Sequence, residues 1–344
     1  MSRLSDTVGA WTEGFGGGWN RFWYTPSDPY PLGLMRLCVG LLALYFQLSY
    51  MPDLVRFFGD DGLLTPQLTE QWNVSAGGFN PGQYSYLSRL HTPAQLYTAH
   101  AIGTGILVLM TIGLFSRVTT VLGLVVVLSY IQRAPMLATH LESVLAMLMF
   151  YLCFGPTGAS WSVDRWWMRR RAAGPAPVAH WERPRYSATV ALRLIQIHLA
   201  LAYAMMALAK IRGISMVTSD LGMEWQDSWG AGTAVWLLIA RPDSPWIDLT
   251  WLRNHPFIIN GWTHAIVIFE LLFPVLIWNR LTRPLMLTVA ALMWGSLALI
   301  SGIAPFSIAM LIGNMAYFPA ETLRALTGGL PLAAPSAPPR LAGA

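Results

Sequence analysis

Residues 189–210 read TVALRLIQIHLALAYAMMALAK, an apolar run whose only charged side chains are Arg193 and the closing Lys210. A helix of this length, rising about 1.5 Å per residue, can cross a hydrocarbon layer of about 30 Å. Seven further apolar segments lie at about 32–51, 97–115, 118–132, 141–157, 257–278, 284–303 and 304–318. The sequence therefore predicts an all-α fold, a polytopic transmembrane helical bundle of about eight apolar segments. Because segments 118–132, 141–157 and 304–318 are short, one or more of them is expected to be tilted, re-entrant or half-spanning.

The composition excludes several classes of protein. With 54% hydrophobic and 11% charged residues, the chain does not have the surface of a soluble domain. Its net charge of +5 comes from arginines dispersed between apolar runs, so no nucleic-acid partner is expected. Cys38 and Cys153 are isolated within apolar stretches, so neither a disulfide framework nor a metal site is predicted. Residues 1–18 show no removable signal peptide, and the first span is expected to direct insertion.

The distribution of arginines predicts an orientation. The densest basic run lies between the segments 141–157 and 189–210 and consists of Arg165, Arg169, Arg170, Arg171, Arg183 and Arg185. The positive-inside rule assigns this run, with both termini, to the cytoplasmic side of the inner (plasma) membrane. Two long Trp-rich loops, 52–96 and 211–256, then lie outside, and residues 231–241 are expected to form a short amphipathic helix. The predicted division is a cytoplasmic segment 1–20, a transmembrane domain 21–320 and a disordered tail 321–344.

Three ionisable residues at the predicted outer boundary are candidates for catalysis. Lys210, the only lysine, ends its apolar run there, and His140 and Glu142 open another segment at the same boundary. Apolar surroundings disfavour the charged form of an amine, so such a lysine can act as a neutral base. A nearby histidine could hold a developing anion, and a carboxylate could set the tautomer of that histidine. The alternative is that Lys210 reaches the lipid headgroups while His140 and Glu142 are polar groups at a helix end.

Other polar residues are candidates for binding or structural roles. Arg133, His100, His264 and Trp229 lie near the same boundary and are candidates for substrate binding. Arg133 could contact an anionic headgroup or a substrate carboxylate. Arg36, Arg193 and Glu270 lie inside apolar segments, where a charge needs a partner. We expect these three to be structural buried charges, with each arginine paired to Glu270 or to another buried acceptor.

Several short patterns, taken in order, resemble the horizontally transferred transmembrane (HTTM) family, to which the vitamin K-dependent gamma-carboxylase belongs. They are Arg21-Phe22-Trp23, Pro31-Leu32-Gly33-Leu34-Met35-Arg36, Phe58-Gly59 with Gly62-Leu63-Leu64, Thr139-His140-Leu141-Glu142-Ser143, Trp161-Ser162-Val163-Asp164, Ala207-Leu208-Ala209-Lys210-Ile211, Trp229 with Gly232, Glu270-Leu271-Leu272-Phe273-Pro274, and Phe306-Ser307-Ile308-Ala309-Met310. The resemblance implies that Lys210 is a base acting on a reduced quinone at the extracytoplasmic face, assisted by His140.

The chain also departs from that family. Residues 284–305 contain no histidine where the carboxylase has a second one, and Trp294 is the nearest large side chain with a polar edge. About a dozen extra residues separate Lys210 from Trp229, and the large lumenal domain of the carboxylase is missing. Carboxylation of glutamate is therefore not expected, whereas related chemistry on a quinone or lipid remains open.

Two functional hypotheses follow from the sequence. In the first, the chain is a membrane enzyme that uses Lys210, His140 and Glu142 on a quinone-like or isoprenoid substrate entering from the bilayer, with a reduced quinone as the possible cofactor. In the second, it is a non-catalytic subunit that contacts lipids and binds a periplasmic redox protein or a larger membrane complex through its Trp-rich loops. A transporter fits less well because we find no inverted repeat.

Overall fold

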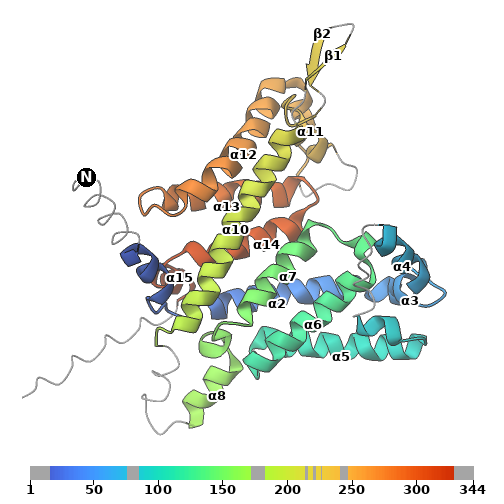
Figure 1. Cartoon of the computed structure of the whole chain (residues 1–344), viewed down its shortest axis with the longest axis vertical. Coiled ribbons are helices and arrows are strands. Elements are labelled where there is room, and N and C mark those ends of the chain that lie inside the picture. The colour runs from blue at the N-terminus through green and yellow to red at the C-terminus, as the bar shows by residue number, and fades with distance from the viewer. Residues whose placement is uncertain are drawn as a thin grey trace, which may run out of the picture.

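The computed structural model describes residues 16–75, 85–171, 183–213, 216–219, 222–225, 227–240 and 247–328, and most of these residues are helical (Figure 1). Five helical stretches are long and apolar enough to cross a membrane, judged by length and composition. They are Tyr30–Phe58, Pro93–Ile112, Tyr186–Arg212, Pro256–Leu276 and Arg283–Ile300. The prediction of a helical protein with apolar, membrane-length helices is therefore confirmed.

A helix occupies each of the eight predicted ranges, although not all eight have the length or apolarity of a full span. The long ones are α2 (Tyr30–Ser49), α5 (Pro93–Ile112), α10 (Tyr186–Gly213), α12 (Pro256–Leu276) and α13 (Arg283–Ile300). The others are α6 (Ser116–Arg133), α7 (His140–Leu152) and α14 (Ala304–Asn314). The α6 helix is as long as α13, at 18 residues each, but it carries more polar side chains, among them Thr119, Thr120 and Ser129.

The two short apolar helices lie at the centre of the bundle. On one side α2 packs against α5, and α5 against α6; on the other α10 packs against α12, and α13 against α14. The α7 helix contacts α2, α6, α10 and α14, and so connects the two groups (Figure 1). Leu145, Leu148, Leu199 and Met310 are completely buried at these contacts. Burial by neighbouring helices rather than by lipid explains why α7 and α14 need not reach across a bilayer.

Small elements close the two ends of the bundle. The connection after α2 forms a 3-10 turn (Met51–Asp53), α3 (Leu54–Phe58) and α4 (Pro66–Ser75), followed by a 3-10 turn (Tyr86–Arg89) before α5. Further 3-10 turns are Pro135–Leu137, Thr157–Ala159, Thr250–Asn254 and Met315–Tyr317. The α8 helix (Val163–Arg171) follows α7, and α15 (Ala320–Thr327) follows α14.

The loop after α10, the helix near residue 235 and the C-terminal tail differ from the sequence prediction. The loop after α10 contains an antiparallel hairpin, β1 (Met216–Ser219) and β2 (Gly222–Trp225), in which Met216 pairs with Trp225. The amphipathic helix expected at 231–241 is the shorter α11 (Ala234–Ile239). The predicted tail 321–344 begins with the helical residues of α15, and residues 329–344, like residues 1–15, lie outside the described part.

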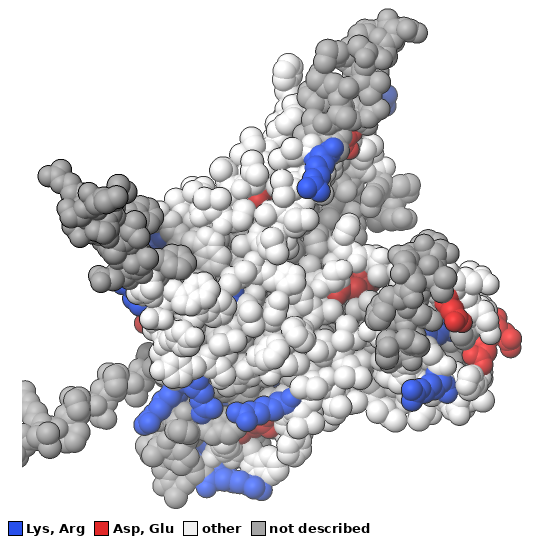
Figure 2. Space-filling view, in the orientation of Figure 1, with Lys and Arg blue, Asp and Glu red and all other residues white. Residues whose placement is uncertain are grey.

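The outer surface of the bundle is mostly uncharged. Figure 2 shows most of the charged side chains near the edges of the molecule and a broad, mostly white area over its middle. Large apolar side chains on α6, α12 and α13 face outward: Val118 is 59% exposed, Ile268 56% and Leu292 69%. Apolar surface of this extent is unfavourable in water and favourable in lipid.

Candidate functional site

Lys210, in the last turn of α10, and Glu270, inside α12, form a nearly buried ion pair between these two packed helices. The Nζ atom of Lys210, on α10, lies 2.7 Å from Oε1 and 2.6 Å from Oε2 of Glu270, on α12. The side chains are only 15% and 2% exposed, respectively. On another side the amine lies 4.6 Å from the ring centroid of Trp229, a cation–π contact. The lysine is therefore held by a carboxylate and an aromatic face.

The turn that carries Trp229 is fixed on α12 by close backbone packing. Gly232 has a φ of +73°, and a Cβ atom there would lie 2.0 Å from Nδ2 of Asn260. That Nδ2 atom donates to the carbonyl of Ala231 at 3.2 Å. His264 lies one turn further along α12, and its Nδ1 is 2.9 Å from the carbonyl oxygen of Asn260. His264 thus packs beside Gly232, and its side chain is half-buried.

His140 opens onto a cavity of about 430 Å³. The walls come from α2, α3, the start of α7 and the start of α14; the lining residues are Tyr45, Phe46, Ser49, Tyr50, Phe57, Leu137, Thr139, His140, Leu141, Glu142, Gly302, Ile303, Pro305 and Phe306. The imidazole ring packs against the ring of Phe306 at a centroid distance of 5.6 Å. Within the described part of the chain neither imidazole nitrogen has a hydrogen-bond partner, so both are available to a molecule in the cavity.

Glu142 has a local structural role at the start of α7. Its Oε2 atom accepts hydrogen bonds from the backbone N–H of Thr139 at 2.6 Å and from the Thr139 hydroxyl at 2.7 Å. In return, the Thr139 side chain caps the first turn, which completes a capping box. The carboxylate is therefore engaged by Thr139, and it does not contact the His140 ring through any hydrogen bond in the described residues.

The structure separates the three predicted catalytic residues into two places. No hydrogen bond, ion pair or ring contact among the described residues joins Lys210 to His140 or Glu142. Three aromatic residues lie between His140 and α10. The rings of Phe306 and Trp294 have centroids 5.2 Å apart, and the Trp294 indole N–H donates to the Tyr203 hydroxyl at 2.6 Å. Tyr203 lies on α10, two turns before Lys210. The predicted juxtaposition of Lys210 with His140 and Glu142 is absent from these contacts.

Tyr203, Trp294 and Asn314 form a buried polar cluster that was not among the sites predicted from the sequence. The Asn314 amide donates to the Tyr203 hydroxyl at 2.9 Å, beside the bond from Trp294. Tyr203 is completely buried, and its ring packs on Phe273 with centroids 3.9 Å apart. A sequence signal existed, because an asparagine and a tyrosine inside apolar segments are expensive unless they are paired.

Arg36 is satisfied by backbone carbonyl groups rather than by a carboxylate. Its guanidinium donates to the carbonyls of Met110 and Thr111, at the end of α5, at 2.5 and 2.9 Å. Two further bonds reach the carbonyls of Thr157 and Trp161 at 3.2 and 2.6 Å. Carbonyl groups at a helix C-terminus lack partners within the helix and carry a partial negative charge, so they suit a buried cation.

Arg193 and Arg133 are likewise held by neutral acceptors. Arg193 donates to the carbonyl of Phe22 at 3.2 Å and to the side-chain oxygen of Gln196 at 2.8 Å. Arg133, which is 1% exposed, contacts the Thr69 hydroxyl at 3.2 Å and the Phe58 carbonyl at 3.4 Å. The burial of Arg133 explains why it fastens the loop after α2 onto α6 rather than facing a ligand.

His100 belongs to a second buried polar cluster, between α2, α5 and α6. Its Nδ1 atom lies 3.2 Å from Nε2 of Gln47 and 2.9 Å from the Tyr130 hydroxyl. Because the Gln47 amide nitrogen can only donate, the Nδ1 atom of His100 accepts. The ring proton of His100 therefore resides on its own Nε2 atom. Among the residues that the structure describes, the His100 Nε2, the Gln47 Oε1 and the Tyr86 hydroxyl are buried and have no hydrogen-bond partner. Burial raises the pKa of Tyr86 to about 12, so its phenol stays neutral.

The fold and these sites define a class of protein: a helical protein with apolar helices of membrane-spanning length and an ion pair between two of them. No protein-family model matches the sequence, and no match is found among the curated proteins or the solved structures.

Proposed function

We propose that this chain is an integral membrane protein of the inner membrane that binds a quinone-like or isoprenoid molecule near the extracytoplasmic ends of its helices. The arginine pattern supports this orientation, with both termini in the cytoplasm and eight apolar segments within or across the bilayer. The order of its sequence motifs supports a relationship to the HTTM family. The bound molecule would enter from the surrounding lipid.

The His140 cavity is the observation that carries this proposal. Aromatic side chains from α2 and α14 supply flat apolar walls, and the imidazole of His140 supplies the polar group. A quinone-like head has the matching chemistry, because its ring stacks on aromatic side chains and its oxygens bind an N–H donor or, when reduced, donate a proton. The imidazole could exchange that proton with the bound molecule.

Lys210 would contribute acid–base chemistry only together with Glu270. Their atoms are 2.6 Å apart, so the proton of the ammonium group can pass to the carboxylate and leave a neutral amine beside a neutral acid. Trp229 then lies with the face of its ring against that amine. In this proposal His140 exchanges the proton of the molecule in the cavity, Glu142 positions His140 by capping α7, and the Lys210–Glu270 pair is a second acid–base group outside the cavity lining.

Binding of a quinone probe to the purified protein tests the proposal. We expect decylubiquinone or its reduced form to bind in detergent, and His140→Leu to weaken that binding by about 2- to 12-fold, the equivalent of one hydrogen bond of 0.5–1.5 kcal/mol. His140→Gln, which keeps a hydrogen-bonding side chain, should recover part of the loss.

His91→Gln is the matched control, because His91 is exposed and paired with Asp60 outside the cavity, at 2.9 Å. The control should bind the probe as the unaltered chain does. Equal affinity in the His140→Leu and His91→Gln variants, or no binding to the unaltered chain, would refute the assignment of the cavity.

A non-catalytic membrane subunit is the second candidate, and the closed Lys210–Glu270 pair is the observation that favours it. A lysine held by two carboxylate oxygens at 2.7 and 2.6 Å joins α10 to α12, and in this second candidate it has no catalytic role. This function predicts no quinone binding and predicts that a membrane or periplasmic protein copurifies with the chain through the Trp229–Trp251 region. Removing Trp251, which is 55% exposed, should release such a partner.

A further inference from the structure

A histidine with a polar partner faces outward near the middle of α10. His198 lies about halfway along this helix, which is long and apolar enough to cross a membrane. Its side chain is exposed, and its Nδ1 atom lies 2.9 Å from the hydroxyl group of Tyr151, near the end of α7. Neither residue lines the His140 cavity or contacts the Lys210–Glu270 pair. A polar pair therefore lies on the outer surface, at the depth of the acyl chains of a bilayer that α10 crosses.

The His198–Tyr151 pair has one unused donor and one unused acceptor in either neutral tautomer of the imidazole. When the Tyr151 hydroxyl donates to Nδ1, the Nε2–H of His198 is the free donor and the Tyr151 oxygen can still accept. When the ring proton is on Nδ1 instead, Nε2 is the free acceptor and the Tyr151 hydroxyl is the free donor. No side chain or carbonyl in the described ranges of the chain forms a further hydrogen bond with either group. Hydrocarbon supplies no partner, and a polar group left unpaired in it is costly.

The surface around this pair is apolar and aromatic. The ring of Phe150 contacts the rings of Tyr151 and Phe154, at centroid distances of 5.5 and 5.1 Å. Phe150 is 49% exposed and Phe154 48% exposed. On α10, Leu201 is 57% exposed and lies one turn beyond His198. Because α7 packs against α10, these five side chains form one outward surface, the α7–α10 face.

We propose that the α7–α10 face joins two copies of this chain as a two-fold dimer in the membrane, with His198 of each copy hydrogen-bonded to Tyr151 of the other. In a two-fold interface the same surface meets itself, so a donor on one copy must find its acceptor on an identical surface. The His198–Tyr151 pair meets this condition in both tautomers. When the two-fold axis lies along the membrane normal, both copies keep one orientation, and two side chains that are bonded within a copy also meet at one depth between copies.

A second copy satisfies this face better than lipid does. Transmembrane helices associate through close packing and through hydrogen bonds between polar side chains, because lipid tails are as apolar as the helices themselves. Acyl chains can pack on Phe150 and Leu201, but they leave a donor and an acceptor of the His198–Tyr151 pair unused. The inference does not depend on what the His140 cavity binds, or on which side of the membrane either end of the bundle faces.

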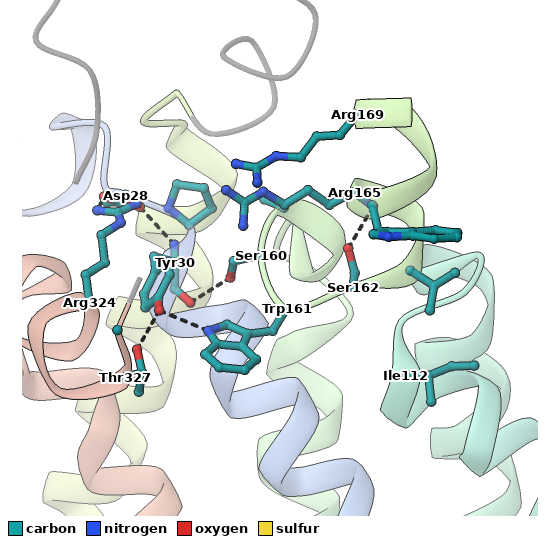
Figure 3. Close-up of a pocket in the computed structure, with 15 residues that line it drawn as sticks. Asp28, Tyr30, Ile112, Ser160, Trp161, Ser162, Arg165, Arg169, Arg324 and Thr327 are labelled. Atoms are coloured by element: carbon teal, nitrogen blue, oxygen red, sulfur yellow. Dashed lines mark hydrogen bonds and ion pairs between the residues drawn. The ribbon is translucent and has the colours of Figure 1, made fainter. Parts of the chain in front are cut away.

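Counting photobleaching steps in lipid vesicles tests the dimer. The full-length chain, with Cys38 and Cys153 replaced by alanine, carries one dye at Glu321→Cys and is reconstituted in phosphatidylethanolamine and phosphatidylglycerol over a range of protein-to-lipid ratios. The dye stays with the bundle, because α15 packs on α2 and the Arg324–Asp28 ion pair fastens it there (Figure 3). We expect vesicles with two dyes to exceed chance occupancy, and this excess to rise with the protein-to-lipid ratio.

Substitutions in the pair locate the interface. His198→Leu should weaken dimerisation about 9-fold, from about threefold for each of the two equivalent hydrogen bonds. Tyr151→Phe removes the same two bonds and should have a similar effect, whereas His198→Asn keeps a donor and an acceptor and should recover part of the loss. His91→Leu is the matched control, because His91 is an exposed histidine paired with Asp60 outside the α7–α10 face.

Two results would overturn the inference. The first is chance occupancy of vesicles by the unaltered chain at every ratio, which would show that it is a monomer in lipid. The second is a dimer that His198→Leu and Tyr151→Phe weaken no more than His91→Leu does, which would place the interface elsewhere.

Discussion

At the scale of single residues, the structure shows how each buried charge is stabilised. Lys210 is paired with Glu270, whereas Arg36 is surrounded by backbone carbonyls. The sequence indicated that such charges need partners, but the partners themselves were hidden: Lys210 and Glu270 are separated by the whole loop after α10. Which acceptor a guanidinium reaches depends on how helices pack, and helix packing is not encoded in local hydropathy.

Removing one member of the Lys210–Glu270 pair should destabilise the fold more than removing both. Lys210→Met or Glu270→Leu leaves a buried charge without a partner and should lower the free energy of unfolding by about 3–5 kcal/mol. The double variant K210M/E270L, which leaves no such charge, should be clearly more stable than either single variant. Unfolding in mixed detergent, followed by circular dichroism, measures this difference; additive losses in the double variant would contradict the pairing.

Glu142 offers a second prediction at this scale. Glutamine also accepts the capping hydrogen bond, so Glu142→Gln should change the free energy of unfolding by less than about 0.5 kcal/mol, whereas Thr139→Ala should lower it by about 0.5–2 kcal/mol. If Glu142 were catalytic, Glu142→Gln would also preserve the fold, but it would abolish quinone turnover. The pattern Thr139-x-x-Glu142 is itself a capping-box signature, so this role could have been found from the sequence.

At the scale of elements, hydropathy located the helices but not their places in the bundle. The predicted segment 189–210 corresponds to α10, which extends less than one turn further at each end, because its apolar residues are continuous. By contrast, nothing in the run 141–157 indicated that α7 would contact four other helices at the centre of the molecule. Hydropathy reports that a side chain avoids water, and it does not distinguish a neighbouring helix from lipid.

The junction of α2 and α5 provides a prediction about elements. Gly113 ends α5 with a φ of +73°, and a Cβ atom there would lie 2.4 Å from Nη1 of Arg36. Gly113→Ala should therefore lower the free energy of unfolding by more than the 1–2 kcal/mol or so of the left-handed backbone alone. Gly261→Ala is the control: it lies in α12 with open space around it, and should be neutral or stabilising by up to about 1 kcal/mol.

At the scale of the whole molecule, the two ends of the bundle differ in chemistry. One end has an arginine-lined cavity beside α8 (Figure 3), and the other has the His140 cavity and the Lys210–Glu270 pair. The arginine distribution in the sequence already indicated this polarity. The convergence of α2, α8 and α15 on one cavity could not be predicted, because it depends on contacts such as Arg324 with Asp28 between the two ends of the chain.

Accessibility of introduced cysteines tests the orientation. In a background where Cys38 and Cys153 are replaced by alanine, Arg253→Cys should react with a membrane-impermeant maleimide added to bacterial spheroplasts. Glu321→Cys, exposed at the arginine-rich end, should react only after the membrane is opened. The reverse pattern of labelling would show that the assignment of the two sides is inverted.

The central claim is that a quinone-like molecule occupies the cavity of His140, and photocrosslinking in lipid nanodiscs tests it most directly. A quinone analogue carrying a diazirine is irradiated with the protein, and the modified residues are located by mass spectrometry. The account predicts adducts on cavity residues such as Tyr45, Tyr50 and Phe306, suppressed by excess decylubiquinone and reduced in His140→Leu. Adducts scattered over lipid-facing residues such as Leu292 and insensitive to competition would contradict it.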